Sequence, residues 1–181
     1  MINRYVRQPV AARAALVTLL LSLVVLTGCS GPEEPLVQPL SAEEVSGERL
    51  WERITEEADF TTYDFWPGHE GYQQGQAPHG PIHRIFVNQP LVSQLPLDPP
   101  VAPDGSIIVK ENRQGDRTLT GYTVMAKVEG FSEGTNDWFW ARYTPDGTVS
   151  AEGTVGNCVV CHAGVQDNDF IIVYPLDRDP E

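Results

Sequence analysis

The middle of the chain contains short runs in which apolar or β-branched residues alternate with polar ones, and turn residues separate these runs. Runs of this kind predict β-strands. The strands are expected at residues 82–87, 106–111, 119–128 and 138–143, with shorter ones at 148–149 and 170–174. No helical pattern lies between them, so the sequence predicts an antiparallel sheet rather than a parallel sheet with crossover helices.

One helical pattern precedes the strands. Apolar residues recur at roughly helical spacing from Val45 to Ala58, and Ser41 with Glu44 forms a capping-box pattern. These features predict a helix over residues 42–58, although Gly47 is expected to weaken it by about 1 kcal/mol relative to alanine. Residues 60–80 are rich in glycine and proline and are expected to form a loop.

The N-terminus has the pattern of an export signal. Three arginines precede an apolar run at residues 14–26 that is short for a membrane span, and the run ends in Leu26-Thr27-Gly28-Cys29. This ending looks like a bacterial lipoprotein processing box, so residues 1–28 are expected to be removed and Cys29 lipidated. The alternative is a plain secretory signal with an incidental cysteine.

The same interpretation divides the rest of the chain. Residues 29–40, which contain three prolines, are expected to form a flexible tether, and residues 41–181 a single domain. The protein is therefore expected on the periplasmic side, anchored by lipid to a membrane, and Ser30 after the lipidated cysteine is compatible with the outer membrane.

The charge narrows the range of partners. All three arginines of the signal would be lost, which leaves nine basic residues against 25 acidic ones, a net charge of −16. This charge argues against nucleic acid or an anionic membrane surface as a partner. A cationic redox protein remains an alternative to a charge that serves solubility alone.

The clearest chemical motif is the stretch GNCVVCHAG, which contains Cys158, Cys161 and His162. The C-x-x-C-H pattern is the attachment signature of one covalent haem c, in which the two thiols bind the haem vinyl groups and the histidine is the axial iron ligand. A zinc site would need four ligands, and the chain has no second cysteine pair. A redox disulfide needs no histidine and usually lies between a strand and a helix, whereas this motif follows a glycine-containing turn.

The chain resembles the cytochrome P-460 family and its relative cytochrome c′-beta. The motif stands near the C-terminus of a strand-rich domain, and further matching pieces precede and follow it in family order. These pieces are Pro78-His79-Gly80, Phe86-Val87-Asn88, the run from Asp104 to Asn112, Val124-Met125-Ala126-Lys127, the run from Asn136 to Ala141, and Asp169-Phe170.

The resemblance implies an α+β fold, mainly an antiparallel β-sheet with an N-terminal helix and a C-terminal haem-c attachment segment. It also implies a five-coordinate haem iron that binds or oxidises small nitrogen species such as hydroxylamine or nitric oxide, often in a homodimer. In the hydroxylamine-oxidising members a lysine is bonded covalently to the haem rim, and Lys110 stands at that position. The alternative for Lys110 is a solvated lysine paired with a carboxylate.

Two positions depart from the hydroxylamine-oxidising members. The distal arginine of those members aligns with His83, and their distal carboxylate aligns with Met125. A thioether accepts no proton, so His83 is the candidate acid–base group. The alternative for His83 is a strand histidine that is satisfied by a backbone carbonyl.

The sixth coordination position of the iron stays open on the sequence alone. Met125 or His79 could occupy it, which would leave an electron-transfer cytochrome, although Met125 also fits core packing and His79 a tight turn. The functional alternatives are therefore an enzyme acting on hydroxylamine or nitric oxide, a six-coordinate electron carrier, and a nitric oxide binder without turnover.

Overall fold

The computed structural model describes residues 38–173 and 175–178. The predicted signal, Cys29 and most of the predicted tether lie outside these residues. In the described part of the chain no helix is long and apolar enough to cross a membrane.

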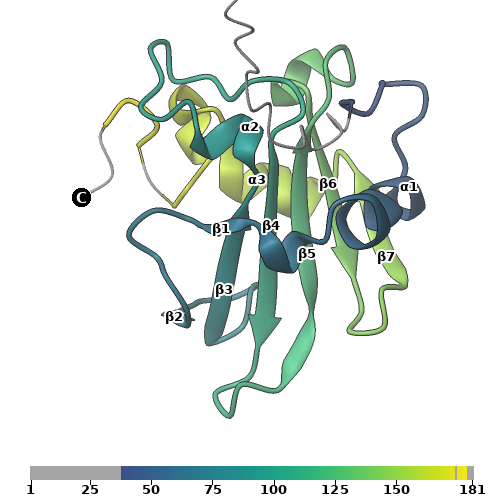
Figure 1. Ribbon diagram of the computed structural model, residues 1–181, viewed down its shortest axis with the longest axis vertical. Helices are drawn as coiled ribbons and strands as arrows, with labels where there is room; N and C mark the ends of the chain where they lie inside the picture. Colours follow the sequence, from purple (N-terminus) through teal and green to yellow (C-terminus); the bar gives the residue numbers. More distant parts are fainter. Residues whose placement is uncertain (1–37, 174, 179–181) are drawn as a thin grey trace, which may run out of the picture. The chain divides into compact units, whose positions relative to one another are not determined.

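The core of the fold is one seven-stranded antiparallel sheet (Figure 1). Two short strands, β1 and β2, pair with the same side of strand β3, and the remaining strands follow in the order β4, β5, β6 and β7. Their bounds are Asp64–Phe65 (β1), Gln73–Gln74 (β2), Ile82–Val87 (β3), Ile107–Arg113 (β4), Leu119–Lys127 (β5), Trp138–Tyr143 (β6) and Val149–Gly153 (β7). From β2 onward neighbours in sequence pair directly, as the absence of helical patterns between the strands predicted.

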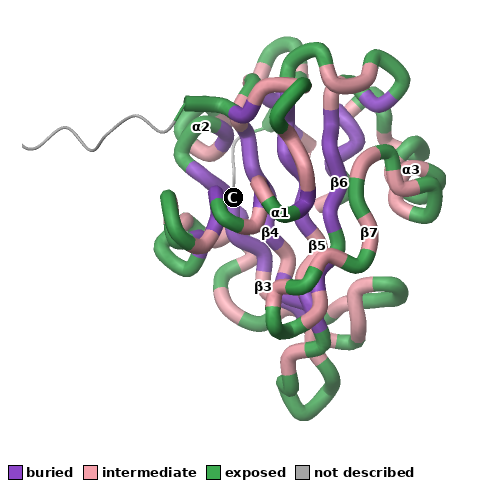
Figure 2. Tube along the Cα trace, turned by 90° about the vertical axis from the view of Figure 1, so that its right-hand side faces the viewer, coloured by how far each residue is buried: buried purple, intermediate pink, exposed green. Residues whose placement is uncertain are grey.

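The central strands are buried on both faces (Figure 2). Successive side chains of a strand point to opposite faces, so β4 places Ile107 and Val109 in one core and Ile108 in another. The sheet therefore separates two apolar clusters, one on each side.

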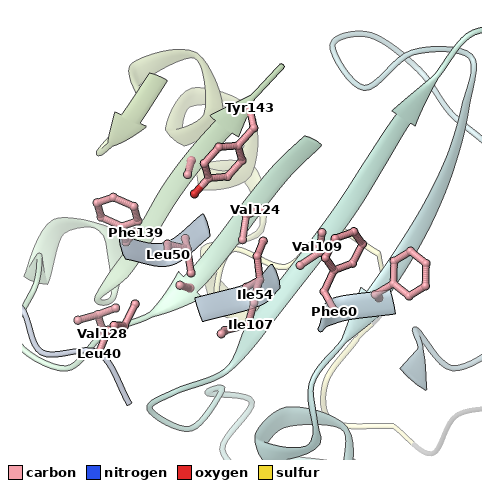
Figure 3. Packing of buried hydrophobic residues seen from close by; sticks show 13 residues of the cluster. Leu40, Leu50, Ile54, Phe60, Ile107, Val109, Val124, Val128, Phe139 and Tyr143 are labelled. Carbon is pink, nitrogen blue, oxygen red and sulfur yellow. The ribbon is translucent and has the colours of Figure 1, made fainter. Parts of the chain in front are cut away.

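The N-terminal helices cover the first face. They are α1 (Gly47–Glu52), the π-helical turn η1 (Arg53–Glu57) and η2 (Phe60–Thr62). Leu50 and Ile54 from this segment point toward Val124 of the sheet in the close view of this core (Figure 3).

The predicted helix start was wrong. Residues 42–44 form a turn, in which the Ser41 hydroxyl donates to Glu44 Oε2 at 2.8 Å, and the helix begins only at Gly47. Ser46 is the cap, because its Oγ accepts a hydrogen bond from Arg49 N at 3.1 Å. Only Ser41 has a glutamate three residues later, but the contacts of Gly47 with the sheet favour a helix that begins after Ser46.

The second face carries the C-terminal part of the chain. It is covered by α2 (Gln89–Val92) and α3 (Gly156–His162), and η4 (Ala163–Asn168) follows α3 directly. A further short helix, η3 (Glu133–Thr135), precedes β6. The expected strand at 170–174 was wrong, since residues 170–173 are irregular, and the expected loop at 60–80 contains β1, β2 and η2. The α+β class with a mainly antiparallel sheet is confirmed.

Candidate functional site

The cysteine–histidine motif forms a short helix, α3, that packs on the second face of the sheet. Cys158 and Val159 contact the apolar cluster of this face, whereas Cys161 and Val160 are exposed. Both thiols are free. Burial raises the pKa of the Cys158 thiol, and nearby Arg142 opposes this effect.

The local context of the motif differs from the expectation. Strand β7 ends at Gly153 and the motif lies in α3, which begins at Gly156, so the motif does have a strand–helix context. Context therefore does not separate a haem site from a redox disulfide. The histidine directly after Cys161 is the feature that separates them.

His162 is fixed by a backbone carbonyl. Its Nδ1 lies 2.6 Å from Phe170 O, and because a carbonyl only accepts, Nδ1 must carry the proton. Nε2 then has the free electron pair that a metal requires. Burial lowers the pKa of His162, the bond to Phe170 opposes this effect, and the charge of Lys110 adds to it.

An aromatic wall faces this histidine. The rings of Trp140 and His162 have centroids 6.2 Å apart, and Trp140 and Phe170 lie 6.1 Å apart, both pairs in edge-to-face geometry. Met125 lies opposite Trp140 on β5 and is nearly buried. Trp138 and Trp140 share this face and Phe139 lies on the other, because successive side chains of a strand alternate.

Lys110 lies on the face that carries α3. Its strand neighbours are Ile85 and Thr123, and it follows Ile108, which belongs to the apolar cluster of this face. Burial lowers the pKa of Lys110 to about 8. Among the described residues no carboxylate forms an ion pair with it, so the alternative of a carboxylate-paired lysine was wrong.

His83 also lies on this face, in strand β3, opposite Asn112. Its side chain is 8% exposed, and its Nδ1 has no hydrogen-bond partner within the described chain. The alternative in which a backbone carbonyl satisfies this ring was therefore wrong for Nδ1. Burial, with a contribution from Lys110, lowers the pKa of His83 to about 4, so the ring is neutral near pH 7.

His79 lies in the loop before β3 and contacts strand β5. Its Nδ1 lies 3.1 Å from the hydroxyl of Thr123 on β5. Burial lowers the pKa of His79 to about 3, and Lys110 and His162 contribute in the same direction. Lys110 is thus within electrostatic reach of His79, His83 and His162, so the fold brings together four residues that the sequence had singled out.

The residues of this face fit a haem. Two free thiols stand at the required spacing, and His162 presents Nε2 to a metal. The same face contains three buried ring nitrogens that lack hydrogen-bond partners in the described chain: His83 Nδ1, Trp66 Nε1 and Trp140 Nε1. Buried polar atoms are nearly always satisfied, so these three point to a polar ligand at this face.

Sequence reasoning missed Thr123, which holds His79. The available signal was a polar residue in β5 on the same face as Met125. Tyr122 and Val124 lie on the other face. It also missed the contacts of Asp169, although Asp169-Phe170 was one of the matching pieces. A hydrogen bond across distant segments has no signature in a single sequence.

A surface hollow of about 340 Å³ lies elsewhere, between α1 and the turn that joins β6 to β7. Its lining includes Glu48, Glu52 and Trp51. It is on the face opposite the motif and contains none of the candidate residues. Within the described ranges no group of three or more histidine, cysteine, aspartate or glutamate side chains is arranged to hold a metal ion.

The comparison with protein families identifies a family for this chain. The family model described as Cytochrome P460 matches residues 61–173, which is more than half of the chain and runs from η2 through α3 to the end of the described core. The match includes Lys110, His83 and the whole cysteine–histidine motif. A search of curated proteins found no match.

Proposed function

Because this chain belongs to the cytochrome P460 family, which implies a haem cofactor, we propose that it binds one covalent haem c and acts on small nitrogen species such as hydroxylamine or nitric oxide. The observation that carries the proposal is the position of α3. Its histidine faces the side of the sheet on which Lys110, His83 and the loop residue His79 lie.

The motif residues have separate roles in attachment. Cys158 and Cys161 would hold the haem by thioether bonds, each thiol adding its S–H across one vinyl group. His162 would offer its Nε2 electron pair to the iron, while its Nδ1–H donates to Phe170 O. A haem held in this way supplies an iron that binds nitrogen ligands and exchanges electrons.

The sheet residues would serve a bound ligand. His83 is neutral near pH 7 and has an unbonded Nδ1, so it can accept a hydrogen bond or a proton from a ligand, or donate one in its other tautomer. Met125, at the position of the family's distal carboxylate, can neither take up nor donate a proton. Lys110, with its pKa near 8, is the residue proposed to bond to the haem rim or to exchange protons near neutral pH.

A six-coordinate electron carrier is the second candidate. It is supported by the positions of Met125 and His79 on the same face as His162, since either side chain is a known type of sixth ligand. A binder of nitric oxide without turnover is the third. A high-spin reduced spectrum would favour an open iron site, and a sharp low-spin spectrum would favour the electron carrier.

The remaining proposals rest on the sequence. The signal and Cys29 support export and lipid anchoring on the periplasmic side, the compartment in which haem c is attached. The net charge supports a cationic redox partner, and the family resemblance supports a homodimer.

The test is the absorption spectrum of the reduced mature protein, produced in a host that attaches haem c, beside that of Lys110→Ala. We expect a red-shifted Soret band that Lys110→Ala abolishes, because the bond from the lysine to the haem rim would be lost. Lys110→Arg is the matched control that keeps the charge but not the amine, and it should behave like Lys110→Ala.

Two outcomes would contradict parts of this proposal. An ordinary haem c spectrum that is the same in all three proteins would reject the lysine bond and leave haem binding intact. A Cys158→Ala, Cys161→Ala, Lys110→Ala protein that still carries covalent haem would reject the proposed attachment site.

A further inference from the structure

A buried ion pair lies beside the candidate haem site. Lys127 Nζ is 2.8 and 2.9 Å from the two carboxylate oxygens of Asp169, and the two residues are 7% and 1% exposed. Asp169 Oδ2 also accepts from Ala102 N at 2.8 Å, and Oδ1 accepts from Asn136 Nδ2 at 2.5 Å. Donors from three separate segments therefore converge on one carboxylate.

Stability alone explains this arrangement poorly. A buried ion pair loses much of its favourable energy to desolvation, and well-packed apolar residues often replace such pairs without loss of stability. Buried pairs are best explained where they specify a particular local geometry. The backbone at Asp169 and Phe170 has an unusual conformation, and a hydrogen bond joins it to His162.

Two consecutive residues at this point adopt left-handed backbone conformations, Asp169 with φ of 51° and Phe170 with φ of 62°. Residues other than glycine seldom adopt such values, and they persist where surrounding contacts enforce them. The carbonyl of Asp169 accepts from Trp138 Nε1 at 2.8 Å, which ties the turn to β6. The next carbonyl, that of Phe170, accepts from His162 Nδ1.

We propose that Asp169 is a positioning residue for the axial histidine. Its carboxylate, held by Lys127, Ala102 and Asn136, fixes the turn that aims the Phe170 carbonyl at His162 Nδ1. This bond keeps the proton on Nδ1, orients the ring and raises the basicity of Nε2, as outer-shell partners of metal-bound histidines do. The inference rests on the proposed role of His162 as iron ligand.

The experiment compares the holoprotein with its Asp169→Asn variant. We expect the iron–histidine stretching band of the reduced protein, measured by resonance Raman spectroscopy, to move to lower frequency. We also expect the midpoint potential to rise, because a weaker bond at Nδ1 makes His162 a poorer electron donor to the oxidised iron. The potential can be read in any coordination state.

The matched control is Glu111→Gln. Glu111 is also a buried carboxylate of the sheet, 3% exposed, and it is bonded to Arg84 and Arg113 on the face opposite α3. Its substitution should lower the unfolding temperature without moving the Raman band or the potential. If Asp169→Asn behaves in the same way, the positioning role is overturned.

A milder variant covers the case in which Asp169→Asn does not accumulate. Asn136 has φ of 53°, so Asn136→Gly keeps the backbone and removes one donor to the carboxylate. It should shift both measurements in the same direction by a smaller amount, and no shift would overturn the inference. A wild-type protein without covalent, histidine-ligated haem would instead refute the proposed function.

Discussion

His83 shows how burial sets the chemistry of a single residue. A histidine in water titrates near pH 6.5, but burial and the charge of Lys110 hold the pKa of His83 near 4. The folded protein therefore keeps this ring neutral over a pH range in which the unfolded chain takes up a proton. Stability linked to His83 is present above about pH 6.5 and is lost as the pH falls toward 4.

This linkage can be measured in the protein without haem, where unfolding is not complicated by the cofactor. The unfolding free energy should fall between pH 6.5 and 4, and His83→Gln should take up about one proton fewer on unfolding in this range. Urea titrations at several pH values give both quantities. If the unfolding free energies of the two proteins depended equally on pH, the assignment of this linkage to His83 would be contradicted. Some pH dependence should remain in His83→Gln, because burial also lowers the pKa of His79.

The sequence predicts the face of Lys110 but not the state of His83, and the reason is physical. Strand alternation is a local property, so the pattern around Ile108 was enough to place Lys110 on one side. Whether a ring nitrogen finds a partner depends on loops that are distant in sequence. Gly75, for example, lies so close that a methyl group there would stand 2.8 Å from His83 Nδ1.

At the scale of elements, the start of α1 is set by contact with the sheet rather than by helix propensity. Gly47 N donates to Glu152 Oε2 of β7 at 2.6 Å, and Gly47 O accepts from the Tyr143 hydroxyl of β6 at 2.8 Å. The sequence pattern at Ser41 and Glu44 is a valid cap, but it cannot reveal these partners. This explains why the predicted helix began too early, while the strands from β3 to β6 were placed well.

The same contacts reverse the expected effect of alanine at Gly47. Helix propensity favours Gly47→Ala by about 0.5–1 kcal/mol, but the added Cβ would lie 2.5 Å from Glu152 Oε2 and 2.7 Å from a methyl group of Val149. We expect a net loss of about 1–3 kcal/mol in unfolding free energy, as for other overpacked sites. Thermal or urea unfolding measures it.

Gly115→Ala is the control, since no heavy atom lies within 4 Å of its added Cβ. It should leave stability within about 0.5 kcal/mol of the wild type. If Gly47→Ala proves as stable as Gly115→Ala, the close packing of α1 against β7 is contradicted.

At the scale of the whole described domain, the two faces of the sheet have different roles. The face under α1 is closed by helices and contains no candidate haem residue, whereas the other face bears the motif helix and the titratable groups. The fold class followed from strand patterns and the motif from its spacing. Only the structure shows which face carries the candidate haem residues, because each strand contributes side chains to both faces.

This division predicts that stability and haem properties can be changed separately. Leu50→Ala removes a fully buried side chain from the first face and should cost about 2–5 kcal/mol in unfolding free energy. The spectrum of the holoprotein should stay unchanged, because Leu50 lies across the sheet from α3. A shifted Soret band in Leu50→Ala would contradict the separation, and Lys110→Ala is the comparison that should shift it.

The position of strand β4 in the sheet limits where residues can be inserted into or deleted from the chain. Its residues belong alternately to the two faces, and the strand is hydrogen-bonded on both sides to β3 and β5. One residue inserted or deleted within β4 ahead of Lys110 would move the lysine into the apolar core under α1 and turn Glu111 toward the motif helix, away from its partner Arg84 on β3. Length variation in this domain is therefore confined to the turns, such as the one at residues 114–118 that joins β4 to β5.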